Sequence, residues 1–262
     1  MIIFFSGTGN SRYVASELSC ILADTQLIDL RGETLAEGIA VSPDPERPVV
    51  WVMPVYSWGL TPVVEKWIER HSKSMLSACN HLLVLTCGDD VGRSASQWRK
   101  LLNRVGWNDK TSVWSVQMPN NYVLMKGFDV DSKAIEQQKL SACHDRIAEI
   151  AVAISKMPVG LTDVVKGGFA WFKSGVIKPW FHAFGMSPKP FHASNACVGC
   201  GLCAKNCPTT NIAMVGQRPR WSDNCALCLS CYHVCPCHAV QYGKATKNKG
   251  QYICPLTSAK NC

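Results

Sequence analysis

Short apolar runs alternate with longer amphipathic stretches over the first 157 residues of the chain. Runs rich in Val, Ile and Leu predict five strands, at 1–5, 26–30, 49–55, 81–86 and 112–118. The stretches between and after these runs predict helices at 10–23, 62–73, 94–106 and 132–156. Strands that alternate with helices form a parallel sheet with helices on both faces. The pattern therefore predicts an α/β domain built on a doubly wound, five-stranded parallel sheet.

The regular alternation ends at about residue 158. Residues 158–194 contain four prolines, a pair of adjacent glycines and many aromatic residues, among them Pro158, Pro179, Pro188, Pro190, Gly167, Gly168, Phe169, Trp171, Phe172, Trp180, Phe181 and Phe184. The aromatic residues either pack two domains together or, since lysines accompany them, form a surface that binds a membrane or a partner. We expect a domain at 1–158, an aromatic-rich linker at 159–190 and a small C-terminal domain at 191–262.

One cysteine spacing occurs twice in the C-terminal region. The segments CVGCGLCAKNCP (197–208) and CALCLSCYHVCP (225–236) both follow the pattern C-x2-C-x2-C-x3-C-P. This spacing lets three thiolates hold one iron–sulfur cubane while the fourth points elsewhere. Structural zinc, the alternative, typically draws four ligands as two separated pairs, which matches these runs poorly.

These two segments resemble bacterial-type dicluster ferredoxins over about 40 residues. The resemblance implies a small α+β domain with two [4Fe-4S] clusters, in which the last cysteine of each motif binds the other cluster. One cluster would be held by Cys197, Cys200, Cys203 and Cys235, and the other by Cys225, Cys228, Cys231 and Cys207. Cys237, Cys254 and His233 are expected to be neighbours or bystanders, because eight better-placed thiolates already complete two clusters.

A loop rich in glycine and hydroxyl groups, S-G-T-G-N-S at 6–11, joins the first strand to the first helix. Its glycines permit tight turns, and the backbone N–H groups at a helix N-terminus attract a phosphate monoester. The loop lacks the G-K-[ST] ending of a nucleoside triphosphate loop, and its spacing does not fit G-x-G-x-x-G.

This loop resembles the FMN phosphate loop of flavodoxins, which implies that Ser6, Thr8, Asn10 and Ser11 hold the phosphate. Two further loops, after the third and fourth strands, resemble the ring-side loops of that family. Tyr56 or Trp58 would lie against the isoalloxazine ring. The expected flavin-binding residues are Ser6, Gly7, Thr8, Gly9, Asn10, Ser11, Pro54, Val55, Tyr56, Ser57, Trp58, Gly59, Thr86, Cys87, Gly88 and Asp89. All three loops follow the carboxyl ends of strands, where doubly wound sheets bind their ligands.

Taken together, the two halves resemble the flavodoxin–ferredoxin fusion proteins of anaerobes, also called EFR1-family ferredoxins. The stretch MPNNY at 118–122 is similar to a motif of that group. Its residues Asn120, Asn121 and Tyr122 either reach the flavin or the cluster domain, or cap a loop. The resemblance implies a flavodoxin-like fold for the first domain.

Charge is distributed unevenly between the two regions. Residues 1–158 contain 16 Lys and Arg against 17 Asp and Glu, whereas residues 159–262 contain 11 against 2. Two clusters, each with a net charge of about −2, would offset about four of the nine positive charges. The remaining excess favours an acidic ferredoxin or oxidoreductase subunit as partner. No nucleic-acid recognition motif accompanies the lysines, and no nucleic-acid partner is expected.

The opening residues lack an export signal, and no apolar run approaches the ~20 residues of a membrane span. We therefore expect a cytoplasmic protein without stable membrane insertion. A homodimer is compatible with the sequence.

Two functions follow from this combination of cofactors. FMN accepts two electrons and releases them singly, while each cubane exchanges one. The first hypothesis is an electron carrier that exchanges electrons with redox partner proteins. The alternative is a ferredoxin-dependent flavin reductase, in which a small oxidised substrate binds over the flavin near Tyr56, Trp58 and Asp89.

Overall fold

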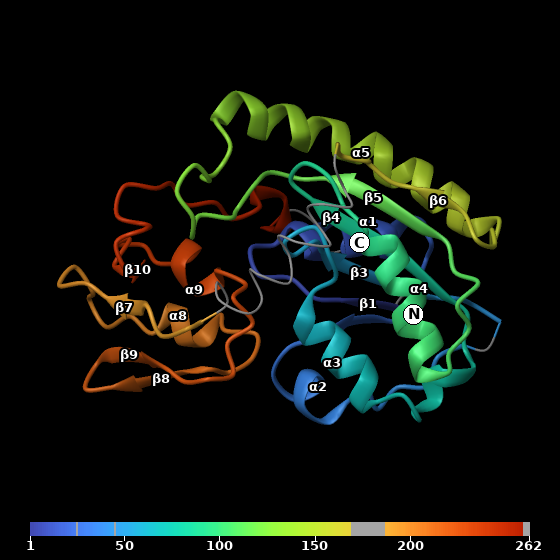
Figure 1. Ribbon diagram of the computed structural model, residues 1–262, viewed down its shortest axis with the longest axis horizontal. Helices are drawn as coiled ribbons and strands as arrows, with labels where there is room; N and C mark the ends of the chain where they lie inside the picture. Colours follow the sequence, from blue (N-terminus) through green and yellow to red (C-terminus); the bar gives the residue numbers. More distant parts are fainter. Residues whose placement is uncertain (25, 45, 169–186, 259–262) are drawn as a thin grey trace.

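The N-terminal domain is a parallel sheet between two layers of helices (Figure 1). The computed structural model describes residues 1–24, 26–44, 46–168 and 187–258, so most of the aromatic segment lies outside the described residues. The sheet has the order β2-β1-β3-β4-β5-β6. Its strands are β1 (Ile2–Phe4), β2 (Leu27–Asp29), β3 (Val49–Pro54), β4 (His81–Cys87), β5 (Val113–Gln117) and β6 (Thr162–Asp163).

All neighbouring strands of this sheet pair in parallel. The first five have the order of flavodoxin-like doubly wound sheets, which confirms the predicted fold class. The short strand β6 adds a sixth member that the apolar pattern does not predict. Its two residues are polar and exposed, so they carry no apolar signal.

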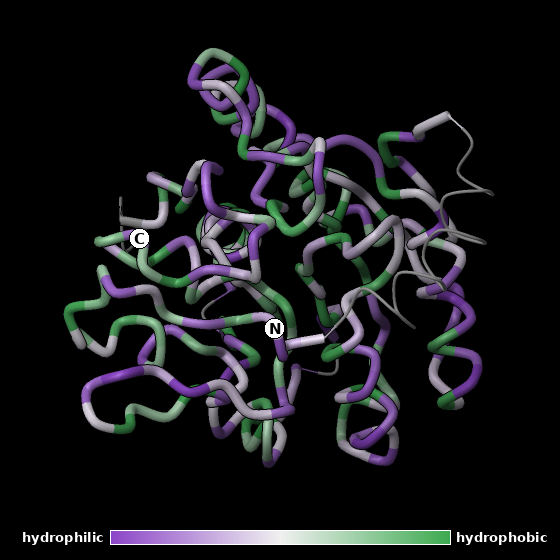
Figure 2. Tube along the Cα trace, turned by 60° about the vertical axis from the view of Figure 1, so that its left-hand side comes forward, coloured by the Kyte–Doolittle hydropathy of each residue, from purple (hydrophilic) through white to green (hydrophobic). Residues whose placement is uncertain are grey.

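Helices α1 (Asn10–Ile21) and α5 (Lys133–Ser155) cover one face of the sheet. The other face is covered by α2 (Gly32–Glu37), α3 (Pro62–Arg70) and α4 (Ser94–Val105), and the 3-10 turn η1 (Met75–Ala78) precedes β4. Alternate residues of β1 separate the two cores, since Ile2 and Phe4 belong to one and Ile3 to the other. The alternation of hydrophobic and hydrophilic residues along the chain is visible in Figure 2.

The C-terminal module consists of two similar short halves with a common core. Strand β7 (Phe191–Ala193) pairs antiparallel with β10 (Val240–Tyr242), and β8 (Ile212–Val215) pairs antiparallel with β9 (Arg218–Trp221). The helices α8 (Leu202–Lys205) and α9 (Ser230–His233) each lie inside one cysteine motif. This arrangement confirms the expected small α+β domain.

After β10 the chain returns to the N-terminal domain. Tyr252 and Cys254 are buried in the core between α1, α5 and the sheet. The 3-10 turn η4 (Pro255–Ser258) packs on α1. The first helix and the last described segment therefore lie side by side, at the edge of the sheet that carries the glycine loop.

Candidate functional site

The glycine loop between β1 and α1 lies at the carboxyl edge of the sheet. Gly9 has φ of 100°, a left-handed conformation that favours glycine, and it caps α1. Its N–H donates to Ser6 Oγ over 3.1 Å. The backbone N–H groups of Gly7, Thr8, Asn10 and Ser11 make no hydrogen bond to any described residue. The loop thus presents a set of available donors at a helix N-terminus.

The side chains of this loop bind neighbouring segments of the chain. Asn121 Nδ2 donates to Thr8 Oγ1 over 2.6 Å. Asn10 Nδ2 donates to the carbonyl of Pro119 over 2.9 Å, and its Oδ1 accepts from the hydroxyl of Tyr252 over 2.7 Å. These bonds fix the position of the loop and leave its backbone as the main surface offered to a ligand.

The phosphate of FMN fits this loop through the backbone. A phosphate monoester needs several donors that converge, and unpaired N–H groups at the start of a helix supply them together with the helix dipole. Ser11, whose hydroxyl lies 2.7 Å from Thr86 Oγ1, connects the loop to the end of β4. When bound, FMN would supply redox chemistry in one- and two-electron steps.

The second expected loop is a tight turn after β3. Val55 N–H bonds to the carbonyl of Thr86, which ties the loop to β4. Tyr56 and Gly59 exchange backbone hydrogen bonds of 2.9 and 3.0 Å around Ser57 and Trp58. Both central residues have positive φ, 47° and 56°, as a two-residue turn of this type requires. Pro54, Val55, Tyr56, Ser57, Trp58 and Gly59 are therefore held in one rigid hairpin.

Tyr56 lies beside the second cysteine motif. Burial raises the pKa of its hydroxyl well above the ordinary value, and the nearby sulfur groups of Cys228 and Cys225 raise it further. The hydroxyl is therefore neutral at physiological pH. Tyr56 connects the ring-side hairpin to the cysteine module.

The third loop follows β4 and is covered by the segment 119–121. A Cβ on Gly88 would clash with the side chain of Asn120, so this glycine permits close packing. Asn120 is in turn fixed by 3.0 Å bonds from its backbone N–H and its Nδ2 to Asp131. Burial raises the pKa of Cys87 to about 12, so its thiol is neutral. The carbonyl of Asp89 accepts from Gln117 Nε2.

The eight motif cysteines form two groups. One cavity is lined by Cys197, Cys200, Cys203 and Cys235. Burial raises the pKa of Cys203, and its nearby thiolates, Cys235 and Cys200, contribute. The first three cysteines of one motif therefore lie with the last cysteine of the other.

The second group has the same composition with the motifs exchanged. Burial raises the pKa of Cys225 to about 11 and of Cys228 to about 12, and the thiolate of Cys207 raises both. Cys231 shows the same neighbours and a pKa raised well above the ordinary value by burial. Thiols with such high pKa values stay protonated without a metal, so metal binding would release protons.

Backbone N–H groups point at three of these sulfurs. Asn211 donates to Cys207 Sγ over 3.2 Å, Leu227 to Cys225 Sγ over 3.3 Å and Ala239 to Cys235 Sγ over 3.2 Å. Such bonds stabilise thiolate charge and tune the potential of a cluster. Among the described residues, no three His, Cys, Asp or Glu side chains converge on a single metal ion.

The second cysteine group touches the glycine loop directly. A Cβ on Gly7 would clash with the backbone carbonyl of Cys228. A Cβ on Gly9 would lie 2.8 Å from Thr257 and 3.0 Å from Cys254. The two glycines therefore allow the cysteine module and the last segment of the chain to approach the loop closely.

His233 links the second motif to the same loop. Its Nδ1 accepts the N–H of Tyr252 over 3.0 Å, so Nε2 carries the proton and donates to the carbonyl of Asn121 over 2.8 Å. Burial lowers the pKa of His233 to about 4, which keeps the ring neutral. Asn121 and Tyr252 both bond to the glycine loop, so the ring is part of a continuous network between the two halves.

Sequence reasoning places Asn121 near the site and leaves its role open; it places His233 only as a neighbour of the cysteines and misses Tyr252. The structure shows that Asn121 contacts both the loop and the cysteine module. Cys254 lies near Cys143 and Tyr252, away from both cysteine groups. A single tyrosine 242 positions after its partner leaves no local pattern that could have predicted the contact.

Comparisons with known proteins identify one part of the chain. A family model for a 4Fe-4S dicluster domain matches residues 189–236, which include all eight motif cysteines. The module is thus similar to iron–sulfur proteins with two clusters. Among curated proteins, none is similar enough to this chain to count as a match.

Solved structures show weak likeness to the N-terminal half. The Trp repressor binding protein from Bacillus subtilis is 14% identical, covers 55% of this chain and 95% of that chain, and has a TM-score of 0.34. A flavodoxin from the domain Archaea is 13% identical; the match covers 59% of this chain and 97% of the flavodoxin, with a TM-score of 0.34. Rubredoxin oxygen:oxidoreductase from Desulfovibrio gigas is 16% identical; the match covers 59% of this chain and 36% of the oxidoreductase, with a TM-score of 0.34. The fold is defined by the order of the strands in the parallel sheet.

None of the described helices has the length and apolar composition to cross a membrane.

Proposed function

We propose that this chain is an electron-transfer protein that holds two [4Fe-4S] clusters on its C-terminal module and FMN on its flavodoxin-like domain. The proposed units are 1–158 for the flavin and 191–262 for the clusters, joined by 159–190. The proposed cluster ligands are Cys197, Cys200, Cys203 and Cys235 for the first cluster and Cys225, Cys228, Cys231 and Cys207 for the second. Membership of the EFR1-family ferredoxins is part of the proposal.

One observation carries this function: the second cysteine group packs on the glycine loop and on Tyr56. A cluster at this position would lie next to a flavin whose phosphate is bound at α1. Direct contact between the two sites favours electron transfer within one chain, without a second subunit. The network through His233 would keep the two sites at a fixed separation.

The proposed cofactors explain the combination of domains. Each cubane exchanges one electron, and FMN stores two, so together they convert between single electrons and pairs. Redox proteins would deliver or accept the single electrons. A reducing cytoplasm suits a protein with eight thiolate ligands.

Cofactor analysis after anaerobic purification tests the proposal. We expect about eight irons, eight sulfides and one FMN per chain, with a thiolate-to-iron absorption band. Reduction by one electron per cluster should give paramagnetic signals from two interacting centres. Zinc in place of iron would overturn the cluster assignment, and iron without flavin would overturn the FMN assignment alone.

No second function is proposed. A flavin reductase needs room for a substrate over the ring, near Tyr56, Trp58 and Asp89. Asn120 covers the loop at 86–89, and Tyr56 lies against the cysteine module. No described feature therefore favours the enzymatic alternative over the carrier.

A further inference from the structure

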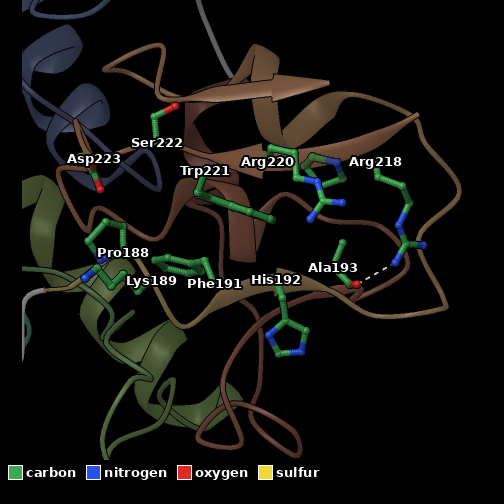
Figure 3. Close-up of a pocket in the computed structure, with 11 residues that line it drawn as sticks. Pro188, Lys189, Phe191, His192, Ala193, Arg218, Arg220, Trp221, Ser222 and Asp223 are labelled. Atoms are coloured by element: carbon green, nitrogen blue, oxygen red, sulfur yellow. Dashed lines mark hydrogen bonds between the residues drawn. The ribbon is translucent and has the colours of Figure 1, made fainter. Parts of the chain in front are cut away.

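A cavity of about 270 Å³ lies between β7 and β9 of the C-terminal module, outside the cofactor sites (Figure 3). The rings of Phe191 and Trp221 stack, with centroids 5.8 Å apart and ring planes inclined by 15°, and form the apolar wall of the cavity. The guanidinium groups of Arg218 and Arg220 lie at one end, and Lys189 and Asp223 lie toward the other. Arg218 Nη2 donates to the carbonyl of Ala193 over 2.7 Å, which fixes that side chain.

The positive groups of this cavity have no carboxylate partner among the described residues. Nine ion pairs occur in the described parts of the chain, and all of them involve residues of 1–163. Asp223 is the single acidic residue of the described range 187–258. Arg220 and Lys189 are exposed at the rim. The cavity is therefore a cationic site open to solvent.

The cavity adjoins both cysteine groups. Pro219 lines it and also lines the cavity surrounded by Cys197, Cys200, Cys203 and Cys235. The indole of Trp221, on the same strand, lies close to Cys231, and its buried Nε1–H makes no hydrogen bond to the described residues. A molecule bound here would be one side chain away from each group.

We propose that this cavity is the docking point for an acidic side chain of a one-electron carrier protein. An Asp or Glu carboxylate would enter between Arg218 and Arg220, because a guanidinium group binds a carboxylate through two parallel hydrogen bonds. The cavity is smaller than the ~300–1,000 Å³ of ordinary small-molecule sites, and its cations reach the surface, so a side chain on a protein fits better than a cofactor-sized anion. The inference rests on the proposed function and names where the partner binds.

Docking at this cavity would allow one electron to pass from the carrier protein to the first cluster. The reduced carrier loses one electron, and the first cluster passes from its 2+ to its 1+ state; no bond forms or breaks. The first group faces solvent, since Cys200 is exposed, whereas the second faces the glycine loop. Electrons would therefore enter at the first cluster and continue to the second.

Binding is tested first, with a method that does not depend on electron transfer. The holoprotein is labelled at the tryptophan indole nitrogens and titrated with a small acidic ferredoxin at low ionic strength. We expect the resonance of Trp221 Nε1–H to shift, and the shift to disappear at high salt. No shift of Trp221 while another surface responds would overturn the inference, even if iron analysis supports two clusters.

The rate of cluster reduction then shows which positive charge attracts the partner. Arg220→Glu should slow reduction of the clusters by the acidic ferredoxin about 10-fold at low salt, whereas Lys244→Glu, the same charge change at an exposed site outside the cavity, should change the rate by less than about 2-fold. Oxidation of the reduced protein by hexaammineruthenium(III), a cation, should not slow in Arg220→Glu. Equal effects of the two substitutions would show that net charge alone attracts the partner and would overturn the docking site.

Two small anions, hexacyanocobaltate(III) and ferricyanide, test whether the cavity binds a protein side chain or a free small anion. If a free small anion is the true occupant, redox-inert hexacyanocobaltate(III) at micromolar concentration should shift Trp221 as strongly as the ferredoxin does. That outcome contradicts the proposal. Ferricyanide oxidation slowed in Arg220→Glu, with no saturation by the inert anion, supports it.

Discussion

The two cysteine motifs share a spacing and a backbone conformation but lie in different surroundings. Residues at equivalent positions have positive φ, 71° at Gly199 and 50° at Leu227, then 72° at Gly201 and 62° at Leu229. In the first motif Val198 is 67% exposed, while in the second both leucines are buried. The same fold of chain therefore presents one cysteine group to solvent and the other to the glycine loop.

This difference assigns separate tasks to the two motifs. Glycine in the first motif relieves the strain of a left-handed backbone. Because it has no side chain, it would also allow another molecule to approach the backbone closely. Leucine in the second accepts that strain, because burial of its side chain stabilises by about 1.5–3 kcal/mol. The buried leucines help to fasten the module against Tyr232 and its neighbours. The second group is thus fixed in an internal contact with the glycine loop, while the first is open to solvent.

Removal of one ligand should have the largest effect. Cys228→Ser is expected to reduce the iron content from about eight to about four per chain, because a three-thiolate site holds a cubane weakly. Iron and sulfide analysis after anaerobic purification measures this loss. Cys79→Ser, which alters a partly buried free cysteine packed on the core of the N-terminal domain, should retain about eight; iron lost equally from both variants would contradict the ligand assignment.

The contact between the second motif and the glycine loop should be sensitive to a single methyl group. Gly7→Ala is expected to destabilise the protein by about 1–3 kcal/mol, since its Cβ clashes with the carbonyl of Cys228. The midpoint of urea unfolding measures the change. Gly168→Ala is the matched control, because no atom of the described residues lies within 4 Å of a Cβ built on Gly168. Similar midpoints for the two variants would mean that the close contact does not determine stability.

The hydrogen-bond network at the loop should contribute less. Tyr252→Phe keeps the buried ring but removes the donor to Asn10 Oδ1, and we expect a loss of about 1–2 kcal/mol. Amide exchange at Gly7 and Thr8 should become faster. Tyr242→Phe removes a hydroxyl bond to Ser187 at the other end of the module and should leave those amides unchanged. Unchanged amide exchange in Tyr252→Phe would show that the hydrogen-bond network does not stabilise the glycine loop.

The smallest effect is expected in the exposed motif. Gly201→Ala should cost about 1 kcal/mol, the strain of a left-handed alanine, since no atom lies within 4 Å of its Cβ. Gly199→Ala should cost more, because its Cβ would lie 2.9 Å from the carbonyl of Gln217. Thermal unfolding under argon compares the pair. Equal losses for the two variants would show that the strain of the left-handed backbone, which the two positions share, and not the space around the Cβ decides which residue the motif accepts.

Prediction from sequence succeeds where many residues repeat one pattern. The five apolar runs become β1 to β5, and the long helix at 132–156 becomes α5, because burial imposes a period on them. The helix α2 has six residues, too few to show a helical period, and was not predicted. The grouping of the cysteines is expected from their spacing and from the resemblance to dicluster ferredoxins.

Contacts made by single residues are what the sequence cannot reveal. Asn121 binds Thr8 at a separation of 113 residues, and Tyr252 binds Asn10 at 242. Each contact depends on one hydrogen bond, and one residue of that kind has no period. The cationic cavity also escapes prediction, because Arg218 and Arg220 come from β9 whereas Lys189 comes from the segment before β7. Only the folded chain brings such residues together.

The return of residues 252–257 to the glycine loop imposes an order on biosynthesis. The loop emerges from the ribosome long before Tyr252, which follows its partner Asn10 by 242 positions, and before Cys254, which also bonds to the loop. Domains fold as units from the N-terminus during synthesis. The flavodoxin-like sheet can therefore form with its carboxyl edge uncovered, and a cofactor can enter there before residues 252–257 dock.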